Sequence, residues 1–274
     1  MKIVFSSPRK VQQFATVFAN LKTFTDNVCI YFRPTGVYIQ CMDDSHCCLF
    51  ECELHADWFE TYEFDDSTDQ PCVGINIAIL NKVLSTWHDS QTFTIKLEAG
   101  QDKLSINFEK DDDENAPDNG QFDKLFELPM VSLESELMNV QLFETLVDLT
   151  VASTLFCSLI KNLMIFNDML TLTFNEESIE CVSSGNEGSM KALITADEVK
   201  EYAIPESTTF KQSYSLRYVQ TMCNFNKLDT EMKMGFGATM PMTMTYSLCD
   251  EEDENKSFAR IHLAPKLEDD IDEY

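Results

Sequence analysis

Apolar residues recur every three or four positions in four separate stretches of the chain. The first runs from Pro8 to Phe24 and gathers its apolar side chains on one side of a helix. Ser7 before Pro8 suits an N-cap followed by proline at the first helical position. The same spacing predicts three further helices, at 78–87, 153–163 and 216–225.

Between these stretches apolar and polar positions alternate, which predicts strands with one buried face. The longest such region is 27–54. A strand at 28–32 is followed by Pro34-Thr35-Gly36, a turn in which glycine can adopt a positive φ angle. A second strand follows at 37–39 and, after a polar break, a third at 47–54. Further strands are expected at 58–64, 92–97, 104–108, 143–149, 231–236 and 241–248.

The second half of the chain repeats the order of the first. A hairpin is predicted from 169 to 183, with its turn at 175–178. Ser178 lies 142 positions after Gly36, and both hairpins follow an amphipathic helix and precede a second one. We therefore predict a tandem duplication of one helix–strands–helix–strands unit. The expected parts are an N-terminal domain at 1–128, a surface connector at 129–142, a C-terminal domain at 143–266 and an acidic tail at 267–274.

Net charge is the most informative bulk property. The chain has 20 basic and 47 acidic residues and a formal net charge of −27, so as a whole it repels nucleic acid. Binding to DNA would therefore require a surface that is locally basic or neutral. The hydrophobic content of 44% is typical of a globular protein, and no apolar run approaches the roughly 20 residues of a membrane span. We expect a soluble, intracellular protein without a secretory signal.

The sequence gives no support to a catalytic or metal-binding role. The ten cysteines contain no C-x-x-C pair, and Cys48, Cys52 and His55 fit no standard zinc spacing. We expect the ten cysteines to be reduced and mostly buried. Ser45 and His46 lie close to Asp43, but on an extended segment their side chains would point to opposite faces. Without a nucleophile elbow or a Walker loop, we expect no enzyme, no metal and no cofactor.

Five segments of the chain, taken in order, resemble a known family. The first, G-V-Y-I-Q-C-M-D-D-S-H at 36–46, looks like a strand and the centre loop of the proliferating cell nuclear antigen (PCNA) family, the eukaryotic-type sliding clamps. The other four follow at the spacings of that family. They are 59–62, 73–84, 216–218, and 263–267 with the acidic tail behind it.

The resemblance implies an α+β DNA-clamp fold with two similar domains per chain, helices lining a ring and antiparallel sheets outside. Three chains would join head to tail through bare edge strands at about 121–128 and 189–195. The implied subunit interface comprises Gln121, Phe122, Leu125, Met190, Ala192 and Ile194. The implied DNA-facing residues are Arg9, Lys10, Lys22, Lys82, Lys161 and Arg217, with Lys227 as a weaker candidate.

The family also binds partners that carry a short motif of a glutamine, an aliphatic residue and two aromatics. The resemblance places the receiving pocket at Met42, His46, Leu49, Leu137, Met138, Val140, Pro241, Ala264 and Pro265. A competing interpretation is that Met42 and Leu49 are simply core residues. Expected partners are double-stranded DNA, a DNA polymerase, a clamp loader, a flap endonuclease, a ligase and further copies of the chain, with no membrane. The expected location is the nucleus, or a cytoplasmic replication site if the gene is viral.

Several residues depart from the family pattern. Ala15 and Thr16 stand where the family carries paired lysines, and Ser158 stands where it carries an arginine, so we expect weak DNA contact. Asn175 corresponds to the usual ubiquitin-acceptor lysine, which puts that regulation in doubt. His262 stands where a tyrosine is usual at the pocket rim. The alternative function is a processivity factor of the same fold that acts as a monomer or as one subunit of a mixed ring.

Overall fold

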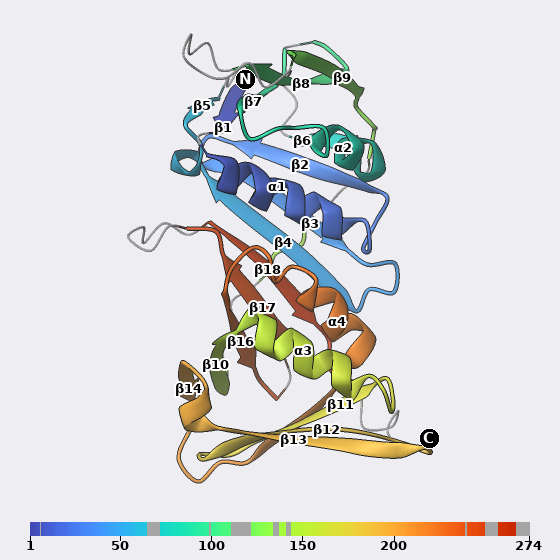
Figure 1. Ribbon diagram of the computed structural model, residues 1–274, viewed down its shortest axis with the longest axis vertical. Coiled ribbons are helices and arrows are strands. Elements are labelled where there is room, and N and C mark those ends of the chain that lie inside the picture. Colours follow the sequence, from blue (N-terminus) through green and yellow to red (C-terminus); the bar gives the residue numbers. More distant parts are fainter. Residues whose placement is uncertain are drawn as a thin grey trace. The chain divides into compact units, whose positions relative to one another are not determined.

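The computed structural model describes residues 1–5, 7–64, 72–98, 100–110, 122–133, 137–140, 144–238, 240–249 and 257–266. These ranges belong to two compact units, each considered by itself (Figure 1). The first unit is drawn from 1–44, 51–137 and 248–258, and the second from 45–50, 138–247 and 259–274. Across the described ranges, no helix has the length and apolar character needed to span a membrane.

The elements of the first half of the chain recur in the same order in the second half, among the residues that the structure describes. The first set is β1 (Lys2–Phe5), α1 (Pro8–Leu21), β2 (Asn27–Arg33), β3 (Gly36–Met42), β4 (Cys48–His55), the 3₁₀ turn η1 (Ala56–Trp58), β5 (Thr61–Glu63), β6 (Cys72–Asn76), α2 (Ile77–Leu84), β7 (Gln91–Lys96), β8 (Lys103–Lys110) and β9 (Lys124–Pro129). The second set is β10 (Val147–Ala152), α3 (Ser153–Leu163), β11 (Met169–Phe174), β12 (Ser178–Gly185), β13 (Gly188–Thr195), η2 (Ala196–Glu198), β14 (Glu201–Ala203), β15 (Phe210–Ser215), α4 (Leu216–Cys223), β16 (Glu231–Phe236), β17 (Met242–Ser247) and β18 (Phe258–Leu263).

Strand pairing repeats together with the order of the elements. In the first unit β1 lies between β5 and β7, and β2 lies between β3 and β6. In the second unit β10 lies between β14 and β16, and β11 lies between β12 and β15, again antiparallel throughout. The same connectivity in both halves confirms the predicted duplication and the α+β class.

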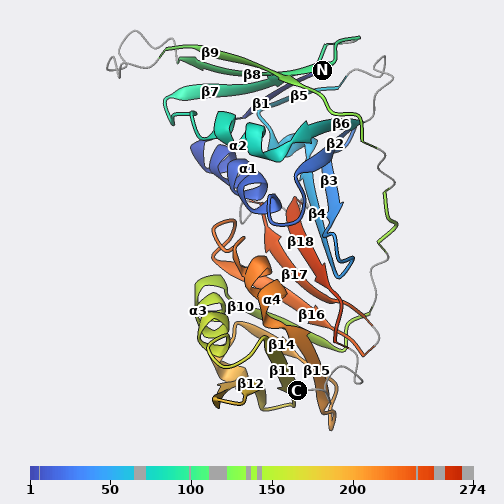
Figure 2. The ribbon, with the colours of Figure 1, turned by 90° about the vertical axis from the view of Figure 1, so that its right-hand side faces the viewer.

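In each unit the two helices lie side by side against the sheets (Figures 1 and 2). The Asn81 side chain of α2 donates to the Phe18 carbonyl oxygen of α1 at 2.9 Å. In the second unit the Cys157 thiol of α3 donates to the Cys223 carbonyl oxygen of α4 at 3.4 Å. The apolar stripe of each helix is buried, which is what the helical periodicity of the sequence requires. The opposite face of each helix is therefore left available for another role.

The N-terminus of α1 is capped as the sequence predicts. The Ser7 hydroxyl oxygen accepts the backbone N–H of Lys10 at 3.3 Å, and Pro8 occupies the first helical position. The helix ends at Leu21, three residues before the predicted end. Phe24 is nevertheless buried, so the apolar spacing there reflects packing after the helix has ended.

Two predicted strands differ from those observed by more than their end residues. The stretch 58–64 was expected to alternate, but η1 precedes it and the strand β5 covers only 61–63. Trp58 and Phe59 are adjacent and both buried, because the Trp58 indole N–H donates to the Leu248 carbonyl oxygen and both rings contact Phe5. The predicted strand 143–149 begins later, at Val147, and runs on to Ala152.

The start of the predicted connector is fastened to the edge of β6. The Val131 N–H donates to the Gly74 carbonyl oxygen at 2.8 Å. A Cβ at Gly74 would lie 2.0 Å from the Val131 carbonyl oxygen and 3.1 Å from Leu133 Cγ. Glycine is therefore required because the connector backbone passes directly over it.

In the second unit, the equivalent edge strand β15 is also covered by a segment of the chain. Strand β15 precedes α4 as β6 precedes α2, and the Lys266 N–H donates to the Ser213 carbonyl oxygen at 2.9 Å. Gly74 and Ser213 each lie two residues before the end of their strand. The chain that leaves the last strand of each repeat thus covers the same edge.

We predict that Gly74→Ala releases the connector from β6. The added methyl group cannot fit beneath Val131, so its hydrogen bond should be lost at a cost of about 1–3 kcal/mol. Hydrogen exchange at the Val131 amide should become at least roughly tenfold faster. Gly237→Ala is the control, because its φ angle is not positive and a Cβ there would first meet only the flexible Met240 side chain, at 3.1 Å. Unchanged exchange at Val131 would show that the contact does not hold the connector.

Candidate functional site

Acidic residues are absent from the four described α-helices, which carry five of the 20 basic residues of the chain. The chain has 47 acidic residues, yet the four described helices contain none. Lys22 follows α1 as its C-cap, and Lys227 lies beyond α4. Each helix pair thus presents a neutral to basic face in a strongly acidic protein. The basic residues within the helices are Arg9, Lys10, Lys82, Lys161 and Arg217.

The predicted DNA-facing side chains are, with one exception, exposed. Arg9, Lys22, Lys82, Lys161, Arg217 and Lys227 are exposed, whereas Lys10 is half-buried with its Nζ 5.6 Å from the centroid of the Trp58 ring. Between the charges the second unit exposes apolar residues, with Leu155 at 66% and Ile165 at 72%. This face therefore offers few cations and much neutral surface.

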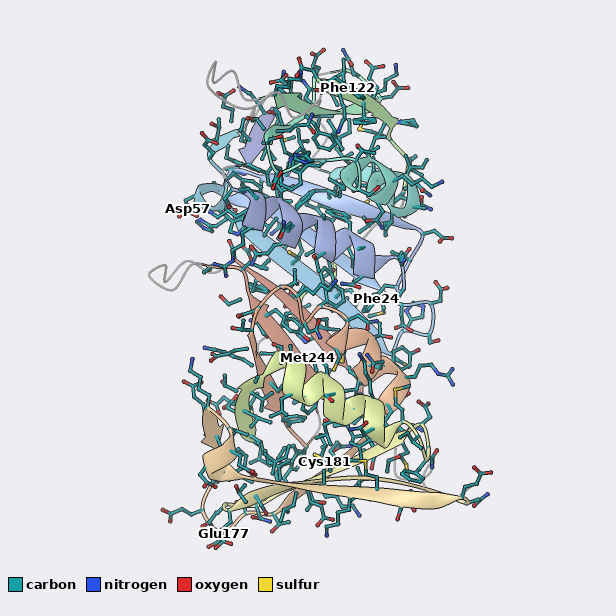
Figure 3. All side chains as sticks on the ribbon, viewed as in Figure 1. Phe24, Asp57, Phe122, Glu177, Cys181 and Met244 are labelled. Atoms are coloured by element: carbon teal, nitrogen blue, oxygen red, sulfur yellow. The ribbon has the colours of Figure 1, made fainter. Side chains whose placement is uncertain are left out.

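Strand β9 is the last strand of the five-stranded sheet β5-β1-β7-β8-β9 in the first unit. Phe122, which is labelled in Figure 3, and Leu125 are 67% and 68% exposed, which is unusual for large apolar side chains. Gln121 falls outside the described residues. A bare strand edge with exposed apolar side chains is the arrangement that a second chain can pair with.

A contact that the sequence did not predict fixes the start of β9. The Gln91 side-chain amide donates to the Phe122 carbonyl oxygen at 2.8 Å. The Lys124 ammonium donates to Gln91 Oε1 at 3.1 Å and to the Thr86 carbonyl oxygen at 2.5 Å. Lys124 thereby ties the edge strand to the end of α2. Nothing in the local pattern around Lys124 distinguishes it from any other exposed lysine.

Strand β13 is the last strand of the four-stranded sheet β13-β12-β11-β15 in the second unit. Met190, Ala192 and Ile194 are half-buried. The Ala196 N–H donates to the Glu177 carbonyl oxygen, and along an antiparallel pair every second residue bonds to the partner strand. The N–H groups of residues 190, 192 and 194 therefore point to β12. The N–H groups of 191 and 193 therefore point away from the sheet. Leu193, which the prediction omitted, is 59% exposed on the other face.

The residues predicted to form the partner pocket differ in exposure. Leu49 is 8% exposed, as a core residue would be, and Met42 is half-buried. Leu137 and Met138 are 40% and 48% exposed. The remaining predicted residues are exposed or half-buried and comprise His46, Val140, Pro241, Ala264 and Pro265.

Within the second unit, one backbone hydrogen bond joins two of the predicted pocket segments. The Ala264 N–H donates to the Cys47 carbonyl oxygen at 2.9 Å, which brings the segment after β18 to the loop that contains His46. His46 has a φ angle of 56°, in the left-handed region that non-glycine residues seldom adopt. The segment 43–46 is a turn, so the expectation that it is extended is wrong.

The cysteines form no metal centre among the residues that the structure describes. No group of three or more potential ligands gathers there. Cys48 and Cys52 are fully buried in β4, while His55 Nδ1 lies 3.1 Å from Asp57 Oδ1. Burial raises the pKa of Cys181 to about 12, so its thiol stays protonated at neutral pH and is a poor ligand or nucleophile.

Asn175 has a structural role in the turn between β11 and β12. Its Oδ1 accepts the backbone N–H groups of Glu177 and Ser178, each at 2.9 Å. This is the local side-chain to backbone bonding for which asparagine is favoured in turns. His262, at the predicted pocket rim, is 8% exposed.

The chain was compared with known proteins. Residues 10–136 match the family model described as "Proliferating cell nuclear antigen, N-terminal domain". "Proliferating cell nuclear antigen 2" of Drosophila melanogaster is 24% identical over 234 residues, covering 85% of this chain and 86% of the relative. "Proliferating cell nuclear antigen" of Chaetomium thermophilum is 24% identical over 245 residues, covering 87% and 88%. Together with the duplicated fold, these matches support the resemblance of the chain to the proliferating cell nuclear antigen family, as a divergent relative.

Proposed function

We propose that this protein is a DNA sliding clamp, which encircles duplex DNA and tethers a DNA polymerase and other replication or repair proteins to it. The observation that carries the proposal is the absence of acidic residues from the four described helices of a chain with a net charge of −27. A helix face of this kind can lie beside the phosphate backbone without repelling it. With so few cations to contact phosphates, the clamp would stay on DNA because the closed ring surrounds the duplex, and not because it binds the duplex tightly. The proposed role is binding and tethering, without catalysis.

A ring follows if the edge strands of successive chains pair. We assign the head-to-tail contact of a homotrimer to β9 of one chain and β13 of the next, with Gln121, Phe122, Leu125, Met190, Ala192 and Ile194 at the interface. Two observations support this assignment. Each strand lies at the edge of its described sheet, and each edge exposes large apolar side chains: Leu125 in β9 and Phe122 just before it, and Leu193 in β13. Pairing would cover these groups and complete the backbone hydrogen bonds.

Partner proteins would bind at the predicted motif pocket. The connector and the segment after β18 would supply its walls, with Ala264 and Pro265 from the latter. An aromatic anchor of a partner needs an apolar hollow with a few backbone donors and acceptors at its rim. The expected partners are a polymerase, a clamp loader, a flap endonuclease and a ligase, and the expected location is the nucleus, or a cytoplasmic replication site if the gene is viral.

The ring is tested by Leu193→Pro. Proline removes the N–H that points away from β12, so pairing with another chain should fail while the sheet of the second unit stays intact. Light scattering should show a three-chain mass for the unmodified protein and a single-chain mass for the variant. Lys211→Pro is the matched control, since it alters β15 at the opposite end of the same sheet. A single-chain mass for the unmodified protein would instead support the monomeric alternative.

Topological tethering is tested on closed and linear DNA. After loading by an ATP-driven clamp loader, the protein should stay on closed circular duplex and leave when the circle is cut. Direct binding to short linear duplex should be weak and should depend little on salt, because few phosphates are contacted. Tight binding to linear DNA that weakens steeply with salt would overturn the proposal.

The DNA-facing helices are tested by Lys22→Ala combined with Arg217→Ala. Removing two of the few cations should reduce polymerase processivity at least about twofold, without changing the assembly mass. Lys200→Ala with Lys233→Ala is the control that removes the same amount of charge. Lys200 contacts Glu231 of β16 at 2.6 Å, and Lys233 is exposed on that strand. Neither lysine lies on a helix or on the strands of the proposed ring contact, so processivity should be unaffected. Equal losses in both double variants would mean that bulk charge, and not the helix face, matters.

A further inference from the structure

A hollow in the second unit, where β10 begins and β14 ends, has no part in the proposed function. Its volume is about 380 Å³, at the small end of the range for ligand pockets. Side chains from the segment before β10, from β10 and β14, from the turn after β11 and from the segment after β14 surround it. The lining residues are Thr145, Leu146, Asp148, Glu176, Tyr202, Ala203, Ile204 and Pro205.

We call this hollow, defined by the lining residues above, the corner hollow. The hydroxyl groups of its Thr145 and Tyr202 side chains donate their hydrogen bonds to protein atoms and not to a ligand. The Thr145 hydroxyl donates to the Asp148 carboxylate at 2.7 Å. The Tyr202 hydroxyl donates to the Asn175 carbonyl oxygen at 2.7 Å. The described lining contains no lysine or arginine. What remains for a ligand are carboxylate and hydroxyl oxygens, which suit a group that only donates hydrogen bonds.

The corner hollow is held in shape by contacts within the second unit. The Ser207 N–H donates to Glu176 Oε1, which fixes the turn after β11 against the segment after β14. A Cβ at Gly235 would lie 2.7 Å from Thr145 Cγ2, so glycine lets Thr145 lie over the neighbouring strand beside Asp148. A site that is formed before binding loses less entropy when a ligand enters.

The duplication supplies an internal comparison for this corner. Asp148 pairs with Ala203 on one side and with Gly235 on the other. Lys2 occupies the equivalent place in the first unit, where it pairs with Glu63 and with Lys96. A hollow of about 490 Å³ lies there too, and its lining mixes lysines with glutamates. General acidity would affect both corners alike, so the acidic, cation-free lining is particular to the second.

We propose that the corner hollow of the second unit binds an arginine side chain presented by a partner protein. A planar guanidinium can donate two hydrogen bonds to one carboxylate while its flat faces pack against apolar or aromatic walls, which Tyr202, Ile204 and Pro205 provide. None of the lining residues belongs to the predicted motif pocket. The site would therefore be a second point of attachment, and it does not depend on the protein encircling DNA.

The test uses the ¹⁵N-labelled full chain and two short peptides. Acetyl-Gly-Arg-Gly-amide is the probe, and the same peptide with citrulline, which is similar in shape but uncharged, is the control. The arginine peptide should shift the Tyr202 and Ala203 amide signals saturably, with a Kd on the order of 1 mM for so small a ligand. The citrulline peptide should bind at least about tenfold more weakly, because its neutral ureido group lacks the positive charge that the guanidinium brings to the carboxylates.

Two charge-neutralising variants separate the site from bulk attraction. Asp148→Asn with Glu176→Gln should weaken the arginine peptide by roughly tenfold or more. Glu177→Gln is the matched control, an exposed carboxylate next to Glu176 that does not line the hollow (Figure 3). It should change the Kd less than about twofold. Equal binding of citrulline, an equal loss in Glu177→Gln, or shifts that do not saturate would each overturn the proposal.

Discussion

A β-sheet leaves backbone donors and acceptors unpaired on its outermost strands. Much of this architecture follows from which of these edges the chain covers with its own segments and which it leaves uncovered. In the first unit the connector covers β6, with Val131 bonded to Gly74. In the second unit the segment after β18 covers β15, with Lys266 bonded to Ser213. For β9 and β13 the described residues supply no equivalent cover. Two edges are thus satisfied within the chain, and two are left for the ring contact proposed above.

The distribution of charge follows a second constraint. A chain with a net charge of −27 can surround DNA only if its carboxylates are kept away from the surface that faces the phosphates. All four described helices lack acidic residues. Exposed charges are screened beyond about 8 Å at physiological salt, so a neutral or basic helix face can act almost independently of acidic strands and loops. Acidity elsewhere would then limit non-specific contact with nucleic acid.

Duplication gave the chain two copies of each structural position, and these copies have since diverged. The corner beside the first strand of each repeat carries Lys2 and Lys96 in one copy and Asp148 and Gly235 in the other. The strand pairing is the same in both, because it depends on backbone geometry and buried apolar side chains. Exposed side chains at the corner are free of that constraint, and so one fold can offer two differently charged surfaces.

The sequence by itself determined the elements whose pattern is local. Helix α3 was predicted at 153–163 and observed there, and the repeat of hairpin and helix revealed the duplication. The helix depends on apolar residues three or four positions apart, and the duplication on the order in which such local patterns recur along the chain. Tertiary structure decided the rest. Trp58 and Phe59 are both buried because Phe5 and Leu248 meet them from distant parts of the sequence. Lys124 fixes β9 through Gln91, and the corner hollow joins Asp148 to Glu176 and Tyr202. Neighbours brought together by folding leave no periodic signal, so only the folded chain could show them.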